Sequence, residues 1–100
     1  MFLYNTTIGI DLEIENEWIQ YMKEVHIPAV MSTGMFVAHK MYKVLHDEGD
    51  GTVSYSVQYF ATTIFNVQQY LEKYGVKLVE EHRMRFMNRH VVFQTLLEEI

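Results

Sequence analysis

The chain has 100 residues, of which 49% are hydrophobic and 21% charged, and it carries a net charge of −5 at pH 7. This length suits one domain, residues 1–100, and the chain has no cysteine for a disulfide or a thiolate metal site. The acidic balance argues against a nucleic-acid-binding surface, and no apolar run approaches the ~20 residues of a membrane span. The start of the chain lacks the basic region of a signal peptide, so we expect a cytoplasmic protein.

The first expected elements are a strand and a helix. Residues 2–10 alternate in polarity, which predicts a strand. Apolar residues then recur at three- and four-residue steps, as in an amphipathic helix: Ile14, Trp18, Met22, Val25 and Ala29. Pro28 removes a backbone donor, so we expect this helix to kink or break there, resume for one turn and end at residues 32–34.

Two strands, a second helix and a last strand follow. Residues 35–45 and 52–60 are expected to be strands joined by a hairpin turn, because HDEGDG at 46–51 has Asp-Gly turn chemistry. Thr62 or Thr63 is expected to cap the second helix, in which Gly75 allows a bend. The apolar stripe of this helix contains Val67, Leu71, Tyr74 and Leu78. Residues 91–97 are expected to form the last strand.

The order βαββαβ predicts an α+β, ferredoxin-like fold, with a four-stranded antiparallel sheet and two helices on one face. In the third strand, Val53, Tyr55, Val57 and Tyr59 alternate with Ser54, Ser56 and Gln58. We assign the apolar set to the helix side, and the polar set to an open face together with Asn5, Thr7 and Gln94.

The open face allows two interpretations. A face of small polar residues can be solvated, or it can let two sheets approach closely in a homodimer, and its apolar border favours the homodimer. Ferredoxin-like domains that bind RNA stack bases on aromatic residues of the third strand. Ser54 and Ser56 occupy those positions here, so RNA binding is excluded.

Three segments carry a family resemblance: EWIQYMKEVHIPAVMSTGMF, VSYSVQYF and EHRMRF…VVFQTLLE. Together they resemble a family of short uncharacterised bacterial proteins, a domain of unknown function, over nearly the whole chain. The family has no activity to carry over to this chain. Met87 and Asn88 depart from its pattern, in which smaller residues such as glycine precede the last strand.

The pattern is more distantly similar to the dimeric α/β-barrel superfamily. That group includes cofactor-free antibiotic-biosynthesis-type monooxygenases, ethyl tert-butyl ether degradation-type proteins and small isomerases. The similarity implies two sheets packed face to face in a dimer, and a small-molecule pocket between each sheet and its helices. A histidine followed two residues later by proline, as in His26 and Pro28, recurs among these proteins at the end of the first helix.

Two histidines are candidate catalytic residues. His26 borders the apolar stripe of the first helix, where it either bonds a backbone group freed by Pro28 or lines a pocket as an acid, base or ligand contact. His82 lies on the stripe of the second helix, as a satisfied core residue or as a second pocket group. The sequence does not show whether the two histidines meet.

The remaining candidates are aromatic or charged. Trp18, Tyr55, Tyr59 and Tyr74 are candidate ligand-binding residues, with core packing as the alternative. Arg83, Arg85 and Arg89 either complement the dipole of the last helix or form an anion site. The turn residues His46, Asp47, Glu48 and Asp50 are expected to be solvated, and no metal-binding or phosphate-binding motif occurs, so we predict neither metal nor cofactor.

These observations predict a homodimeric α/β-barrel domain that binds a small molecule. One alternative is a cofactor-free enzyme of the monooxygenase or small-isomerase kind, with His26 or His82 transferring a proton. The other is a structural interaction module without a ligand, whose polar sheet face serves only to dimerise.

Overall fold

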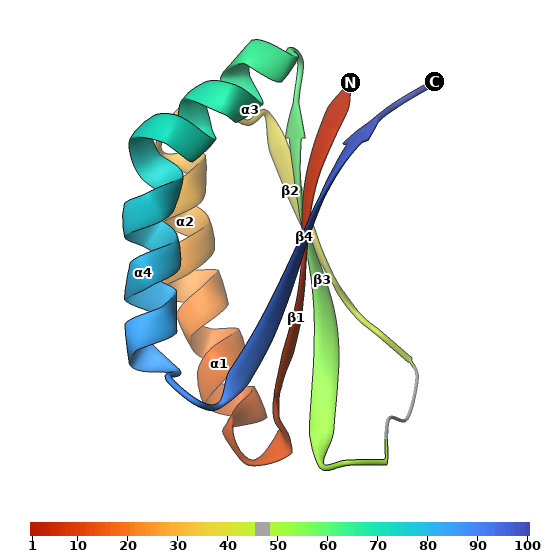
Figure 1. Ribbon diagram of the computed structural model, residues 1–100, viewed down its shortest axis with the longest axis vertical. Helices are drawn as coiled ribbons and strands as arrows, with labels where there is room; N and C mark the ends of the chain where they lie inside the picture. Colours follow the sequence, from red (N-terminus) through yellow and green to blue (C-terminus); the bar gives the residue numbers. More distant parts are fainter. Residues whose placement is uncertain (46–48) are drawn as a thin grey trace.

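The computed structural model describes residues 1–45 and 49–100 and shows a sheet with helices on one face (Figure 1). The strands are β1 (Phe2–Asp11), β2 (Ala38–Lys43), β3 (Thr52–Ala61) and β4 (His90–Glu98), arranged antiparallel in the order β2-β3-β1-β4. The ferredoxin-like βαββαβ fold is therefore confirmed. The predicted hairpin turn includes residues 46–48, which lie outside the described residues.

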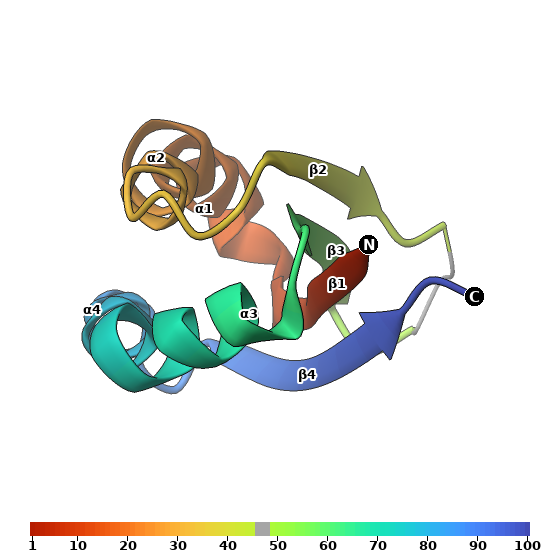
Figure 2. The ribbon, with the colours of Figure 1, turned by 90° about the horizontal axis from the view of Figure 1, so that it is seen from above.

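Two helical segments cover the sheet. The first consists of η1 (Leu12–Ile14), α1 (Glu15–Tyr21), η2 (Met22–His26) and α2 (Ile27–Met31). The second consists of α3 (Ile64–Tyr70), η3 (Leu71–Gly75) and α4 (Val76–Arg85). Seen from above, the first segment lies toward β2 and the second toward β4 (Figure 2). The Thr63 hydroxyl accepts a hydrogen bond of 3.1 Å from the Asn66 N–H, which confirms Thr63 as the cap of α3.

Each helical segment contains a π turn, η2 in the first and η3 in the second. In η2 the Ile27 N–H donates to the Met22 carbonyl, five residues earlier, which adds one residue to the turn. The break predicted at Pro28 is wrong, but the helix does continue for about one turn beyond it, as α2, and ends at residues 32–34 as predicted. The backbone stays helical through Pro28. Proline lacks a backbone N–H, but a residue in the first turn of a helix such as α2 does not need one to complete the hydrogen bonds of the helix.

The added residues shift the buried stripe of each segment. Val25, predicted to face the core, is 54% exposed, whereas Ile27 is 4% exposed. In the second segment Leu71 and Tyr74 are 37% and 38% exposed, and Tyr70 is buried in their place. A regular 3.6-residue period cannot describe a helix with an extra residue in its middle. The predicted stripes are therefore correct as far as Met22 and Val67, and after the π turns only in part, at the half-buried Ala29 and Leu78.

The strand register sets the two faces of the sheet. Val53, Tyr55, Val57 and Tyr59 of β3 are buried on the helix side, as predicted. Gln94 is a correction. It pairs with Thr6 of β1, which lies between the buried Tyr4 and Ile8, so Gln94 faces the helix side rather than the open face. Because β4 is apolar on both faces, only its pairing with β1 reveals its phase.

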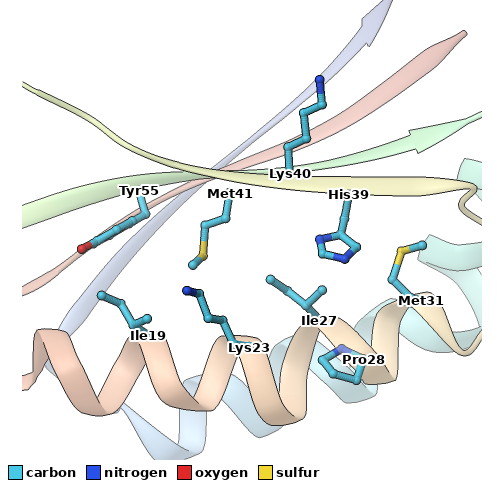
Figure 3. Close-up of a pocket in the computed structure, with 9 residues that line it drawn as sticks. All are labelled: Ile19, Lys23, Ile27, Pro28, Met31, His39, Lys40, Met41 and Tyr55. Atoms are coloured by element: carbon cyan, nitrogen blue, oxygen red, sulfur yellow. The ribbon is translucent and has the colours of Figure 1, made fainter.

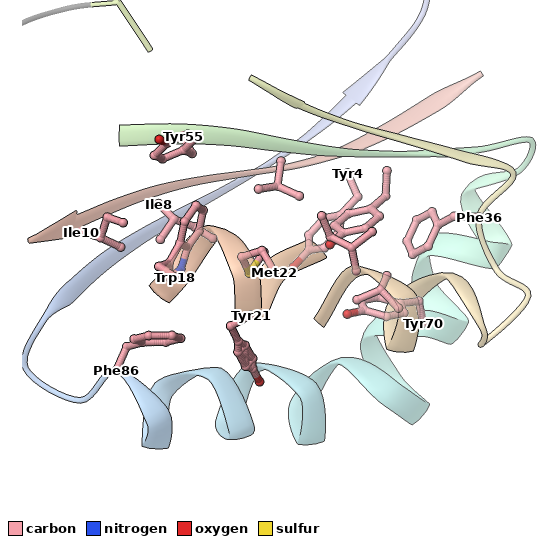
Figure 4. Close-up of a cluster of buried hydrophobic side chains, with 14 of the residues drawn as sticks. Tyr4, Ile8, Ile10, Trp18, Tyr21, Met22, Phe36, Tyr55, Tyr70 and Phe86 are labelled. Carbon is pink, nitrogen blue, oxygen red and sulfur yellow. The ribbon is translucent and has the colours of Figure 1, made fainter. Parts of the chain in front are cut away.

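Aromatic side chains dominate the core between sheet and helices (Figure 4). Trp18, Ile8 and Tyr55 lie together at one end, and Tyr4, Phe36 and Tyr70 lie at the other. Phe36 enters the core just before β2 begins, which is why this strand starts at Ala38 rather than at residue 35. In the described part of the chain, no helix is both long and apolar enough to cross a membrane.

Candidate functional site

The fold brings the two candidate histidines into contact. His26 comes from η2 and His82 from α4, and their ring centroids lie 5.7 Å apart. The ring centroid of His90, the first residue of β4, lies 4.9 Å from that of His82, and the His90 Nδ1 is 2.8 Å from the Phe86 carbonyl. His82 therefore contacts both of the other histidines.

Trp18 determines the state of His82. The Trp18 Nε1–H donates a buried hydrogen bond of 2.9 Å to the Nε2 of His82. An indole N–H is only a donor, so Nε2 carries no proton and the neutral ring holds its proton on Nδ1. Burial lowers the pKa of His82 to about 3, and repulsion from His26 and His90 contributes further. His82 is therefore neutral at physiological pH.

A small cavity of about 30 Å³ lies between these histidines and the sheet. Its polar lining includes Thr6, His26, Tyr59, His82 and Gln94. Within residues 1–45 and 49–100, two buried polar atoms of this lining have no hydrogen-bond partner, the Nδ1 of His26 and the hydroxyl of Tyr59. Burial lowers the pKa of His26 to about 4 and raises the pKa of Tyr59 far above its usual range. Both groups are neutral, and the space between them fits a water-sized molecule.

Tyr55 lies elsewhere, on the far side of Trp18. The two rings are 5.0 Å apart, and the Tyr55 hydroxyl donates a hydrogen bond of 2.5 Å to Glu15. The same Glu15 oxygen lies 3.0 Å from the Lys43 ammonium. These two partners lower the pKa of Glu15, and burial together with Glu15 raises the pKa of Tyr55. Tyr55 and Glu15 are thus satisfied groups.

The structure separates the other predicted ligand residues. Trp18 is fully buried and donates its hydrogen bond to His82, and Tyr59 lines the cavity. Tyr74 lies in η3, is 38% exposed and does not line the cavity. Sequence reasoning missed Thr6 and Gln94 as lining residues. The strand register was the signal needed for both of them, because it places them opposite each other on the helix side.

A larger groove of about 670 Å³ runs between the first helical segment and the edge strand β2 (Figure 3). Ile19, Lys23, Ile27 and Met31 point into it from the helix, and His39, Met41 and Tyr55 point into it from the sheet. Lys40 belongs to the same strand but points away, with its ammonium 5.7 Å from the ring centroid of Phe60. Sequence reasoning did not find this groove, because no motif marks it.

The arginine cluster does not form a free anion site. Arg89 lies 2.7 Å from Asp11 and 3.2 Å from Glu13, and Arg83 pairs with Glu80 on its own helix. Arg85 lies 3.6 Å from Glu17. All three guanidinium groups therefore have carboxylate partners. Among the residues that the structure describes, no group of three histidines, cysteines or carboxylates could hold a metal ion.

Several solved structures share this fold at low sequence identity. An EthD (ethyl tert-butyl ether) family protein from Bacillus halodurans is 13% identical, with a TM-score of 0.68 over 100% of both chains. A dimeric ferredoxin-like protein from an uncultured marine organism is 13% identical, with a TM-score of 0.72 over 100% of this chain and 95% of its own. An antibiotic biosynthesis monooxygenase is 12% identical, with a TM-score of 0.62 over 100% of this chain and 99% of its own.

These likenesses establish the fold, and they confirm the similarity to the dimeric ferredoxin-like proteins. No protein with a curated description matches the chain. A family profile described as "Domain of unknown function (DUF4286)" matches residues 1–100. The chain therefore belongs to the DUF4286 family, as the resemblance of its three segments predicted.

Proposed function

We propose that the protein is a homodimeric α/β barrel that binds a small polar molecule in the cavity between its sheet and its helices. One observation carries this proposal. The His26 Nδ1 and the Tyr59 hydroxyl are both buried beside the same cavity without a partner among the described residues. Leaving a polar atom buried and unpaired costs about 1–3 kcal/mol, so a molecule that bonds both atoms recovers this free energy on binding.

The lining indicates the chemistry of the ligand. His26 and Tyr59 are both neutral, since burial shifts their pKa values away from the physiological range in opposite directions. A neutral imidazole and a phenol offer donors and acceptors but no charge. The ligand is therefore a neutral molecule little larger than water, with both a donor and an acceptor, such as formamide or methanol. Val79 and Gln94 line the cavity and are also exposed to solvent, so the ligand would enter the cavity between them.

Binding accounts for the site better than catalysis does. A general base works best when its pKa lies near the working pH, whereas the pKa values of His26 and His82 are lowered to about 4 and about 3. The Nε2 lone pair of His82 is also occupied by the Trp18 N–H. His82 is thus a positioning residue in the proposed site, and His26 is the group that meets the ligand.

The open face of the sheet supports the homodimer. Its centre is a network of small polar side chains, in which the Ser56 hydroxyl donates a hydrogen bond of 2.6 Å to Asn5. Its β4 side is apolar, with Val91, Phe93 and Leu97 exposed by 58%, 67% and 45%. Apolar side chains clustered on one face are typical of an association surface.

The cavity is tested by titrating the ¹⁵N-labelled protein with formamide and with methanol while recording amide NMR shifts. We expect saturable shifts at the lining residues, and their loss in the His26→Phe and Tyr59→Phe variants. Tyr74→Phe is the matched control, because it removes an equivalent hydroxyl outside the cavity. Shifts that persist in both cavity variants, or that centre on another part of the molecule, contradict the proposal.

Tyr59→Phe also has a diagnostic effect on stability. Removing a hydroxyl that has no partner should leave the free energy of unfolding unchanged or raise it by about 1 kcal/mol, as measured by urea unfolding. If the free energy of unfolding falls by more than about 1 kcal/mol, the Tyr59 hydroxyl is already hydrogen-bonded in the free protein, and the proposed ligand site is incorrect.

A further inference from the structure

The groove along β2 contains basic groups where a closed core would have apolar ones. Lys23 stands between Ile19 and Ile27 at four-residue spacing, and all three point toward β2 (Figure 3). Across the groove, His39 and Met41 project from alternate positions of the strand. Ile27 is 4% exposed, so the floor of the groove is continuous with the core. A ligand in the groove would therefore meet an apolar floor with basic groups beside it.

Lys23 has no ion-pair partner within the described ranges 1–45 and 49–100. The carboxylate of Glu15, near the Tyr55 end of the groove, is already bonded to Tyr55 and Lys43. The charge that faces the groove is thus positive, although the chain as a whole carries −5. An ammonium group without an ion-pair partner in a hollow of an acidic protein favours an anionic ligand.

We propose that this groove binds an amphipathic monocarboxylate, with its carboxylate on Lys23 and His39 and its apolar body along Ile27, Met31 and Met41. The Lys23 ammonium would form a charge-assisted hydrogen bond, and the His39 imidazole donates an N–H in its neutral form as well. A volume of about 670 Å³ lies within the range of small-molecule sites. The flexible side chains of Met31 and Met41 can adapt to different apolar bodies.

This site is separate from the histidine cavity and does not depend on it. The two hollows share none of their lining residues. The groove lies between the first helical segment and β2, on the helix side of the sheet, so association through the open face leaves it accessible. Failure of either proposal therefore leaves the other intact.

The test uses decanoate as the probe, kept below its micellar concentration, with amide NMR shifts as the measurement. Decanol tests the apolar body alone, acetate tests the charge alone, and decyltrimethylammonium reverses the charge. We expect saturable shifts along α1, η2, α2 and β2 with decanoate, and weaker binding of all three control compounds. If decanol or decyltrimethylammonium binds as tightly as decanoate, or if the shifts centre outside the groove, the proposal is overturned.

Two charge reversals provide a matched pair of variants. Lys23→Glu and Lys73→Glu change the net charge equally and both replace exposed side chains, but Lys23 points into the groove, whereas Lys73 lies in η3 and is not one of its lining residues. We expect Lys23→Glu to weaken decanoate binding about tenfold or more, and Lys73→Glu to weaken it less than about twofold. Urea unfolding checks that both variants remain folded. Equal weakening by the two variants would show a general charge effect and overturn the assignment.

Discussion

The two faces of the sheet are built from the same strands but differ in the side chains that they carry and in their burial. On the helix side, large apolar and aromatic residues alternate along β3, and they enclose histidines whose pKa values lie far from their usual range. On the open side, Ser54, Ser56 and Gln58 form a polar centre with an apolar region along β4. The core and the buried histidines thus lie on one face, and the proposed association would use the other.

The largest expected effect concerns the helix side: the free energy of unfolding should fall in acid because the buried histidines are neutral in the folded chain. Between pH 6.5 and about 4, the unfolded chain binds protons on His26 and His82 that the folded chain does not bind. The free energy of unfolding should therefore be highest at neutral pH and fall as the pH is lowered through this window. His26 alone accounts for a loss on the order of 3 kcal/mol. Urea unfolding at several pH values measures the slope.

Two variants assign this slope to its source. His26→Gln and His82→Gln each remove one titrating ring and should flatten the dependence on pH. If the two buried variants lose stability with acid as steeply as the parent protein, the histidines are not the groups responsible.

The Trp18–His82 hydrogen bond should give the next largest effect. His82→Leu leaves the buried Trp18 N–H without an acceptor, and we expect a loss of about 2 kcal/mol relative to His82→Gln, whose side-chain oxygen can accept the bond. Chemical unfolding of the two variants at pH 7.5 measures this difference. Equal stabilities would mean that the indole N–H gains nothing from its partner.

The open face should respond with the smallest change in stability and a large change in mass. Phe93→Asp places a charge on the exposed apolar part of β4, so we expect it to convert the proposed dimer into a folded monomer of about 11.9 kDa. Its circular dichroism should be unchanged, because exposed substitutions rarely alter stability by more than about 0.5 kcal/mol. Light scattering on a size-exclusion peak gives the mass.

Val76→Asp is the control for this experiment, since Val76 is 75% exposed on α4 at the helix side. This variant should remain dimeric. A parent protein that is already a monomer at micromolar concentration, or a Phe93→Asp variant that remains a dimer, contradicts association through the open face.

Much of the fold could be predicted because its signals are local. The alternation along β3 and the change of period between strands and helices each depend on neighbouring residues. The inward stripes were partly wrong, because an extra residue in each helix changes which side chains face the sheet. Val25 and Tyr74 were placed in the core for this reason, and both are exposed.

The candidate site was harder to predict because it depends on relations between distant segments. His26 and His82 are 56 positions apart in the sequence, and only the packing of two helices on one sheet brings their rings to 5.7 Å. The phase of β4 depends on its pairing with β1, so Gln94 was placed on the wrong face. Lys23 resembles any solvated lysine until β2 is seen opposite it.

The two π turns also affect how this chain should be compared with other sequences. A relative whose helices are regular has one residue fewer between the inward positions on either side of each turn. An alignment that allows gaps only in loops would then match the residues after η2 and η3 with positions on a different face of the relative's helices. Gaps of one residue inside Met22–His26 and Leu71–Gly75 restore the correspondence. Searches for distant relatives should therefore permit them.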